Sequence, residues 1–283
     1  MPAPELSLAV TLAVLGAGFL HALWNAMLKS AAGEPLLDTA LIVAGGTVVA
    51  LLTLPFVGTP AIVSWKFMAL SALIHFGYYV TLSGAYRRGD LSFAYPLMRG
   101  VAPLFVTLLG LLFLGEHPTP QMLTGIALIS IGILVIAWFA SGKHTPAAAG
   151  WAIANAAIIS LYTLVDGAGA RASGNAVAYV CWLIFLEGFP YMIWIVATRG
   201  RPAVTYMAGR WRRALAGGAA SLAAYGIVLW AMTRAPVAVV AALREVSVLF
   251  AALIGALVLK EGFGWRRMAG AASVVAGVAA LRL

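Results

Sequence analysis

The chain has 283 residues, of which 63% are hydrophobic and 10% charged, with a mean hydropathy of +0.99 and a formal net charge of +9. A soluble domain is close to half apolar and a quarter charged, so this composition excludes a water-soluble globule and indicates a polytopic membrane protein. The basic residues gather at the ends of apolar runs, where membrane topology explains them, so we predict no nucleic-acid partner.

Ten apolar runs follow one another along the chain, and each has roughly the 20 residues that a membrane-spanning helix needs. They cover residues 6–28, 36–57, 62–86, 91–114, 119–140, 147–165, 176–197, 211–232, 236–259 and 265–281. Lipid offers peptide groups no hydrogen-bond partner, and none of the runs alternates in polarity as a barrel strand would. The sequence therefore predicts an all-α polytopic membrane protein with ten transmembrane helices.

The second half of the chain repeats the first at an offset of 145 residues. The segment Arg99-Gly-Val-Ala-Pro-Leu-Phe105 in the fourth run aligns with Arg244-Glu-Val-Ser-Val-Leu-Phe250 in the ninth. A fixed period of this kind indicates two structural repeats, which we predict to be residues 1–145 and 146–283. Because five helices are an odd number, the second repeat starts from the opposite membrane face, which gives a 5+5 inverted repeat around a central site.

The repeat also pairs small and acidic residues. The fifth and tenth runs each carry two glycines seven residues apart, which share a helix face and favour close helix packing: Gly125, Gly132, Gly270 and Gly277. Two related glutamates follow the core of the fourth and ninth runs, and we predict that they cap a helix or pair with local basic groups: Glu116 and Glu261.

The basic residues predict the orientation of the chain. If the loops are numbered in order, the odd loops hold 12 of the 18 Lys and Arg residues, the even loops and the C-terminus hold 4, and two lie inside helices. The positive-inside rule then places the odd loops in the cytoplasm and both termini outside it. We predict a protein integral to the plasma membrane, which would be the inner membrane of a bacterium.

An arginine inside an apolar helix is costly in lipid and is a functional candidate by default. Arg99 and Arg244 each lie eight residues into their helices, about 12 Å from opposite membrane faces, so both reach towards the midplane. The guanidinium fork suits carboxylate, phosphate or phosphonate, so the pair predicts an anion clamp. The alternative is structural pairing with Glu245 or Glu187. Because neighbours on a helix point apart, we expect Arg244 and Glu245 to have different partners.

Other polar and aromatic side chains of the runs are candidates for the substrate cavity. They lie on helix faces shared with a histidine or near the arginines, or at the corresponding places of the second repeat: Trp24, Asn25, Tyr78, Tyr79, Tyr95, Tyr162 and Tyr225. Ionisable groups in the same helices are candidates for carrying a coupling proton: Glu187, His75, His21 and Glu245. A hydrogen bond to a neighbour is an equally good interpretation of either histidine, and an ion pair with a buried arginine is the alternative for Glu187.

The sequence offers nothing that an enzyme needs. It contains no P-loop, GxSxG, HExxH or GxGxxG pattern, and His117 and His144 lie in loops on opposite faces, so we predict no catalytic residue, metal site or cofactor. The single cysteine, Cys181, excludes an intramolecular disulfide and is expected to be a buried, inert thiol. A membrane-embedded lipid enzyme would need a nucleophile or metal cluster, and a channel would need a repeated polar filter.

The paired stretches around Gly115-Glu116 and Lys260-Glu261, with ten helices in a five-plus-five duplication, resemble the EamA family of the drug/metabolite transporter superfamily. The resemblance spans the whole chain and implies a secondary carrier with a central cavity, often an exporter of amino acids or other metabolites. The stretch His21-Ala-Leu-Trp-Asn25 is similar to a subgroup associated with phosphonate utilisation. Family members are usually drawn with both termini in the cytoplasm, whereas the charge distribution here predicts the opposite.

These observations predict a secondary active transporter of a small polar metabolite with an anionic group, such as an amino acid, an organic acid or a phosphonate. The alternative is an exporter of lipophilic cations that uses Glu187 and an aromatic lining. The expected partners are the substrate and membrane lipid, and the protein is expected to be a monomer or a homodimer.

Overall fold

The structure is a computed structural model that describes residues 6–29, 34–139, 145–258 and 264–282. Every regular element in these ranges is helical, which confirms the predicted all-α class. The helices are α1 (Leu8–Lys29), α2 (Pro35–Val57), α3 (Trp65–Tyr86), α4 (Leu91–Leu109), α5 (Pro120–Trp138), α6 (Pro146–Ala172), α7 (Ala176–Ala208), α8 (Trp211–Met232), α9 (Val237–Arg244), α10 (Ser247–Val258) and α11 (Trp265–Ala280).

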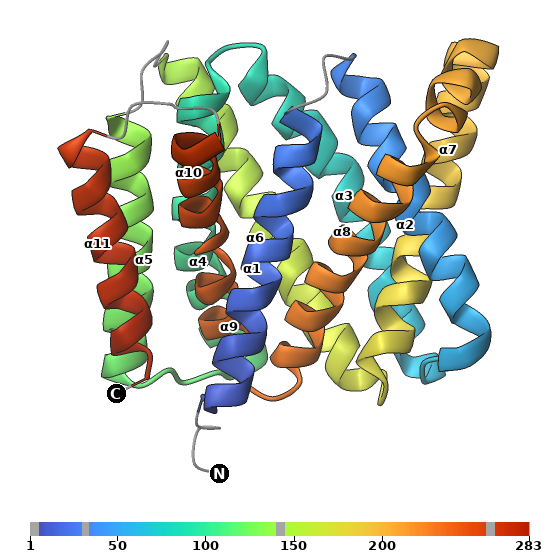
Figure 1. Cartoon of the computed structure of the whole chain (residues 1–283). Helices are drawn as coiled ribbons and strands as arrows, with labels where there is room; N and C mark the ends of the chain where they lie inside the picture. The colour runs from blue at the N-terminus through green and yellow to red at the C-terminus, as the bar shows by residue number, and fades with distance from the viewer. Residues whose placement is uncertain (1–5, 30–33, 140–144, 259–263, 283) are drawn as a thin grey trace.

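Nine segments of the described chain are long and apolar enough to cross a membrane, with α9 and α10 forming one of them. The 16-residue α11 lies beside α5 over most of its height (Figure 1). A short 3-10 turn, Ile62–Ser64, precedes α3, and a π-helical turn, Gly110–Leu114, continues α4. The helices stand side by side in a bundle, and its two termini emerge at the same end (Figure 1).

Three boundaries differ from the sequence prediction. α6 runs on to Ala172, seven residues beyond the apolar run, because Asp166 and Arg171 are held by partners inside the protein. α7 continues to Ala208 through a kink at Gly200, whose φ of 62° is a conformation that favours glycine. The predicted ninth helix is two helices, α9 and α10, separated by a turn.

The predicted close packing of the fifth and tenth runs is confirmed. A Cβ atom on Gly132 would lie 2.5 Å from the carbonyl oxygen of Gly270, and one on Gly125 would lie 2.8 Å from that of Gly277. These pairings also show that α5 and α11 run antiparallel, as an inverted repeat requires. A similar approach joins α2 to α8, where Gly45 meets the backbone of Ala214. Small residues let helix backbones approach closely where lipid provides no hydrophobic driving force.

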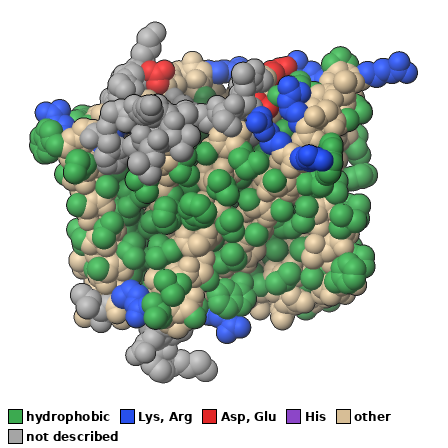
Figure 2. Space-filling view, in the orientation of Figure 1, with side chains coloured by type: hydrophobic (Ala, Val, Ile, Leu, Met, Phe, Trp, Pro, Cys, Tyr) green, Lys and Arg blue, Asp and Glu red, His purple; other side chains and the backbone are tan. Residues whose placement is uncertain are grey.

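The first helix of each half packs against helices of the other half. α1 packs against α8 and α10, and the corresponding helix of the second half, α6, packs against α3 and α4. The side of the bundle seen in Figure 2 is predominantly hydrophobic, while Lys and Arg side chains gather at its two ends and mostly at the upper one. The exposed apolar side chains are therefore the surface that faces lipid, and the interleaved helices enclose the polar residues.

Candidate functional site

The bundle contains a helix that breaks within the apolar core. The N–H groups of Glu245 and Val246 donate to the carbonyls three residues earlier, those of Ala242 and Leu243, and α10 starts anew at Ser247. A tight 3-10-type turn in the middle of a helix often marks a functional hinge or local strain. The break carries one of the two predicted arginines, Arg244, as the last residue of α9.

Arg99 and Arg244, one from each half, meet at a single carboxylate. The Nε of Arg99 lies 2.5 Å from Oε2 of Glu245, and the Nε of Arg244 lies 3.6 Å from Oε1. The side chains of both arginines are 7% exposed and that of Glu245 is 1% exposed. The expectation that Arg244 and Glu245 serve different partners is wrong, because the helix ends between them and the turn brings the neighbours together.

Arg99 has further contacts that fix its position in α4. Its Nη2 donates to Oγ of Ser247 at 3.4 Å, at the first residue of α10. Its guanidinium carbon is 5.9 Å from the ring centre of Tyr95, one turn earlier in α4. Arg99 therefore joins α4 of the first half to both sides of the break in the second half.

The residues predicted from α1 lie beside the break. A Cβ on Gly18 would be 3.4 Å from the backbone nitrogen of Ser247, and His21, one turn later, is within electrostatic range of both arginines. The ring of Trp24 meets His21 edge-on at 5.1 Å, and its buried Nε1 has no hydrogen-bond partner among the described residues. The Asn25 side chain instead donates to the carbonyl of His21 at 2.7 Å, which turns its amide towards its own helix.

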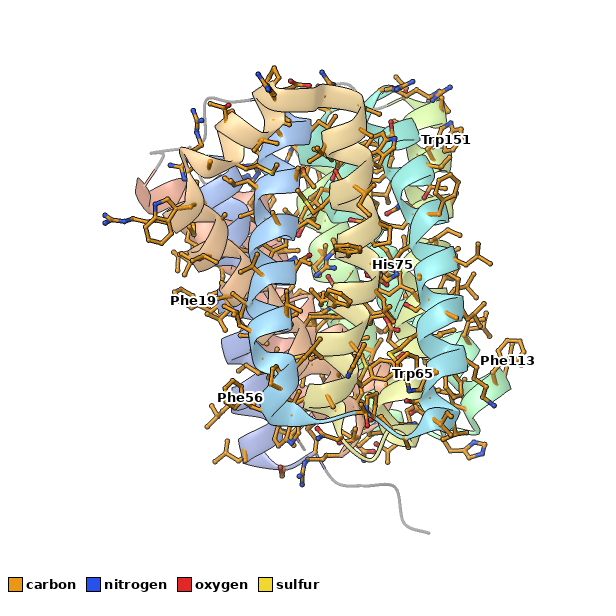
Figure 3. All side chains as sticks on the ribbon, turned by 90° about the vertical axis from the view of Figure 1, so that its right-hand side faces the viewer. Phe19, Phe56, Trp65, His75, Phe113 and Trp151 are labelled. Atoms are coloured by element: carbon orange, nitrogen blue, oxygen red, sulfur yellow. The ribbon has the colours of Figure 1, made fainter. Side chains whose placement is uncertain are left out.

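Glu187 and His75 form a second polar contact, near the middle of the bundle's height (Figure 3). Nδ1 of His75 lies 3.1 Å from Oε1 of Glu187, and the imidazole stacks on the ring of Tyr162 at 4.3 Å. In the structure, therefore, Glu187 pairs with the histidine rather than with Arg99 or Arg244. Tyr78, on the turn after His75, meets Tyr162 edge-on at 6.1 Å. The side chain of Tyr79 lies outside the described part of the structure.

Asp166 is a buried ionisable residue that the sequence analysis missed. It is fully buried in α6 and accepts hydrogen bonds from the hydroxyls of Tyr225 at 2.5 Å and Tyr179 at 3.1 Å. It was missed because the sixth apolar run was ended at Val165, which placed Asp166 beyond the helix. Its spacing of four residues from Tyr162, on the same helix face, is the signal that points to it.

The two polar groups are joined through the tyrosines predicted to line the site. Tyr162 lies within electrostatic range of Arg99, Arg244 and Asp166. Tyr225 is hydrogen bonded to Asp166 and is within range of Arg244. The predicted lining residues of α4, α6 and α8 are thus brought together in one region, with Arg99, Arg244 and Glu245 on one side of Tyr162 and Asp166 and His75 on the other.

Glu116 has the kind of role predicted for it, with partners distant in sequence. One oxygen accepts from Nη2 of Arg171 at 2.7 Å and from the backbone N–H of Val237 at 2.8 Å, and the other accepts from Ala238 at 3.4 Å. Glu116 therefore caps the start of α9, the half-helix that ends in Arg244, rather than α5. Its repeat partner Glu261 lies outside the described residues.

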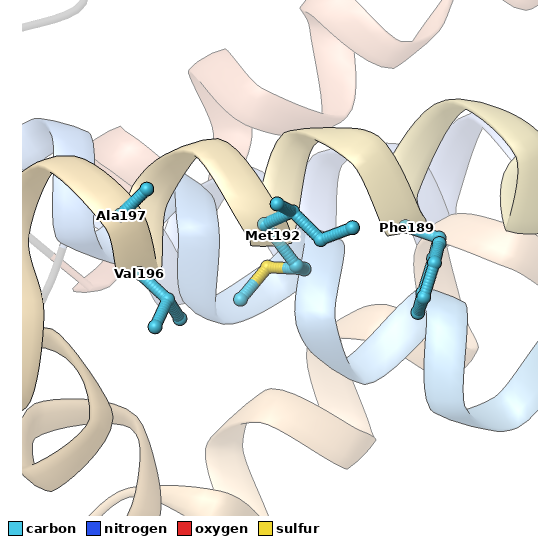
Figure 4. Close-up of a pocket in the computed structure, with 5 residues that line it drawn as sticks. Phe189, Met192, Val196 and Ala197 are labelled. Carbon is cyan, nitrogen blue, oxygen red and sulfur yellow. The ribbon is translucent and has the colours of Figure 1, made fainter.

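Other features of the described chain do not form a site. The described residues include no group of three or more His, Cys, Asp or Glu side chains placed to hold a metal, and Cys181 is a buried free thiol. An apolar hollow of about 420 Å³ lies along α7 and is lined by Phe189, Met192, Ile193, Val196 and Ala197 (Figure 4). Four of these five residues are exposed on the bundle's outer surface, where lipid would cover them.

Comparison with known proteins agrees with this architecture. A solved structure described only as "Crystal structure of protein" superimposes with a TM-score of 0.72 at 18% sequence identity, covering 96% of this chain and 94% of that one, which shows a shared fold. A search of curated proteins found no match. The model of the EamA-like transporter family matches residues 8–138 and again residues 146–283. Since the two matches together cover nearly the whole chain, it belongs to the EamA-like transporter family, whose members are transporters of the drug/metabolite transporter superfamily.

Proposed function

We propose that the protein is a secondary active transporter of a small polar metabolite with an anionic group, such as an amino acid, an organic acid or a phosphonate. Arg99 and Arg244 bind the anionic group. Trp24, Tyr95 and Tyr162 contribute to the surrounding surface, together with the other predicted aromatic residues, Tyr78, Tyr79 and Tyr225. Asn25 has a lesser part, since its amide is engaged with its own helix.

The observation that supports this proposal is the convergence of two guanidinium groups on one carboxylate at a broken helix. Two positive charges face one negative charge, so the group retains an excess positive charge in a region that water reaches poorly. An excess charge buried in lipid is costly and is kept where it has a function. A substrate oxyanion supplies the missing negative charge.

Glu245 serves in this proposal as an internal stand-in for the substrate. Its carboxylate already occupies the donor fork that a substrate carboxylate or phosphonate would use. Substrate binding requires Glu245 to give up its contact with at least one arginine, which opens the turn between α9 and α10. Glu245 is therefore a coupling residue in this proposal, alongside Glu187, His75 and His21.

The rival function, export of lipophilic cations, receives less support. It needs a carboxylate free to meet a cation and arginines that are fully neutralised. Glu187 is engaged with His75 at 3.1 Å, and the two arginines share Glu245 between them. The charge at the helix break thus favours an anionic group over a cationic one.

Alternating access in this proposal comes from rocking of the two repeats, residues 1–145 and 146–283, around the break in α9 and α10. Glu116 joins the first repeat to Arg171 and to the start of α9 at the end where both termini lie. We further propose that the carrier lies in the plasma membrane with this end outside the cytoplasm, because the opposite end holds most of the basic residues.

A ligand-stabilisation screen on purified protein tests the proposal. Amino acids, phosphonates and quaternary amines are compared by the shift each causes in the unfolding temperature. Ligands with an anionic group are expected to stabilise the native chain and the matched control Arg212→Ala, which removes an exposed arginine, but not Arg99→Ala or Arg244→Ala. Stabilisation by quaternary amines alone, equal in all four proteins, would instead support the cation exporter.

A further inference from the structure

The carboxyl of Asp166 is buried without a permanently charged partner. Two tyrosine hydroxyls, from Tyr179 of α7 and Tyr225 of α8, donate to its oxygens, and Ser71 of α3 lies nearby. Glu245, by contrast, is buried against two arginines. A carboxyl group surrounded by hydroxyls in a region of low dielectric is satisfied both with and without a proton, because a hydroxyl can donate or accept.

His75 contacts Glu187 and is within electrostatic range of this carboxyl. Its Nδ1 is 2.9 Å from the carbonyl oxygen of Ser71, 3.3 Å from the Ser71 hydroxyl and 3.1 Å from Glu187. A single ring nitrogen serves only one of these partners at a time. The imidazole therefore has competing partners, Glu187 on α7 and Ser71 on its own helix, and Ser71 in turn lies near Asp166.

The exposed fraction of the side chains changes along this group. The side chains of Glu187 and His75 are 18% and 16% exposed, whereas Asp166 is 0% exposed. The titratable groups that face Asp166 from the neighbouring helices are His75 of α3, Glu187 and Tyr179 of α7 and Tyr225 of α8, with Tyr162 on its own helix. The group thus leads from partly accessible residues to an enclosed carboxyl.

We propose that Asp166 is the site at which the carrier holds its coupling proton, and that Glu187 and His75 are the groups through which this proton enters and leaves. An O–H bond forms at Asp166 as the bond that held the same proton on His75 or Glu187 breaks, and no electrons are exchanged with any other group. This inference rests on the proposed function, since a proton site has a purpose only in a coupled carrier.

The position of Asp166 explains how such a proton would act on the substrate. Tyr162 stacks on His75 and lies within electrostatic range of Asp166 and of both arginines. A charge that appears or disappears at Asp166 therefore changes the potential where the substrate anion binds. Proton uptake removes a negative charge on one side of Tyr162, and the lower negative potential favours an anion beside the arginines on which Tyr162 also borders.

Infrared difference spectroscopy of the purified protein between acidic and alkaline pH tests this inference without any substrate. The native protein is expected to show a titrating carboxyl band that is lost in Asp166→Asn. The matched control is Asp38→Asn, which changes another buried aspartate bonded to a tyrosine hydroxyl, that of Tyr206 at 2.6 Å. This control and Glu187→Gln should both keep the band. A band that persists in Asp166→Asn, or that only Glu187→Gln removes, would overturn the inference.

A second variant covers the case in which Asp166→Asn does not fold. Tyr225→Phe keeps the carboxyl and removes one donor, so the pH midpoint of the band should move, and an unchanged midpoint would also count against the inference. Arg99→Ala is expected to keep the band while losing stabilisation by anions. The band therefore tests the proton site, and anion stabilisation separately tests the proposed function.

Discussion

At the scale of single residues, the most distinctive feature of this chain is its set of buried ionisable side chains. Arg99, Arg244 and Glu245 form one group, and Asp166, Glu187 and His75 form another. Removing one partner of a buried ion pair leaves the other charge uncompensated, which costs more than the pair itself contributes. Substitutions in the first group should therefore affect stability and binding together, and a bound anion can offset part of the loss.

The substitution Glu245→Gln tests that compensation. It keeps the size of the side chain and leaves two guanidinium groups without a carboxylate, so the unfolding temperature of the purified variant should fall in an anion-free buffer. Added methylphosphonate should restore more stability to this variant than to the native protein, as thermal unfolding with and without the anion would show. An equal response of the two proteins would contradict the role of Glu245 as a stand-in for the substrate.

The substitution Glu187→Gln tests proton coupling at the level of transport. The amide cannot accept a proton from His75, so the pH dependence of transport in vesicles should flatten while insertion into the membrane is kept. Glu34→Gln is the matched control, because Glu34 pairs with Arg199 at the surface, where both side chains are 45% exposed. A pH profile identical to that of the native carrier would exclude Glu187 from coupling.

Close packing of the helices depends on small residues, whereas the break between α9 and α10 depends on neighbouring helices that bury it. α5 and α11 meet through glycines, whereas α9 is enclosed by α1, α4, α5, α6 and α8, so the buried turn between α9 and α10 is shielded from lipid. The first half has no such break at the corresponding position of α4. The inverted repeat is therefore unequal at its centre: one half supplies an unbroken helix with Arg99, and the other a helix with a tight turn directly after Arg244.

A pair of glycine substitutions separates packing from helix propensity. Gly132→Ala places a Cβ within 2.5 Å of the Gly270 carbonyl and should destabilise the protein by about 1–3 kcal/mol, the usual cost of overpacking. Gly150→Ala in α6 meets nothing within 4 Å and should be neutral or stabilise by up to about 1 kcal/mol. Unfolding of both variants in detergent measures the difference, and similar stabilities would mean that α5 and α11 do not need close contact.

The whole molecule has most of its basic residues at one end and both termini at the other (Figures 1 and 2). This asymmetry is what the positive-inside rule acts on, because basic loops resist transfer across the membrane. The interleaving of the two halves also means that neither half can move as an isolated body. The proposed rocking would therefore have to change the contacts of α1 with α8 and α10 and of α6 with α3 and α4.

Cysteine labelling tests the proposed orientation. In a Cys181→Ala background, Lys66→Cys places an exposed thiol at the end that holds the termini, and Arg212→Cys places one at the basic end. An impermeant maleimide added to intact cells should label the first variant at once and the second only after permeabilisation. The reverse pattern would place both termini in the cytoplasm.

The sequence by itself determined the helical class, the family and the presence of one arginine inside an apolar helix of each half. Each of these depends on local composition or on a repeat that is still visible in the sequence. The close approach of α5 and α11 was also readable, since glycines seven residues apart have one evident use in lipid. The pairing of Arg244 with Glu245 could not be read from the sequence, because it depends on a helix break at residues that include no glycine or proline.

Only the tertiary structure decided which buried charges meet. Glu187 faces His75 rather than an arginine, and Asp166 lies inside the bundle because α6 continues beyond its apolar run. Apolar periodicity records which residues avoid water, but the partner of a buried charge is chosen by helices from the other half of the chain. The long-range geometry of an interleaved inverted repeat therefore sets the electrostatics of the site, and no local pattern encodes it.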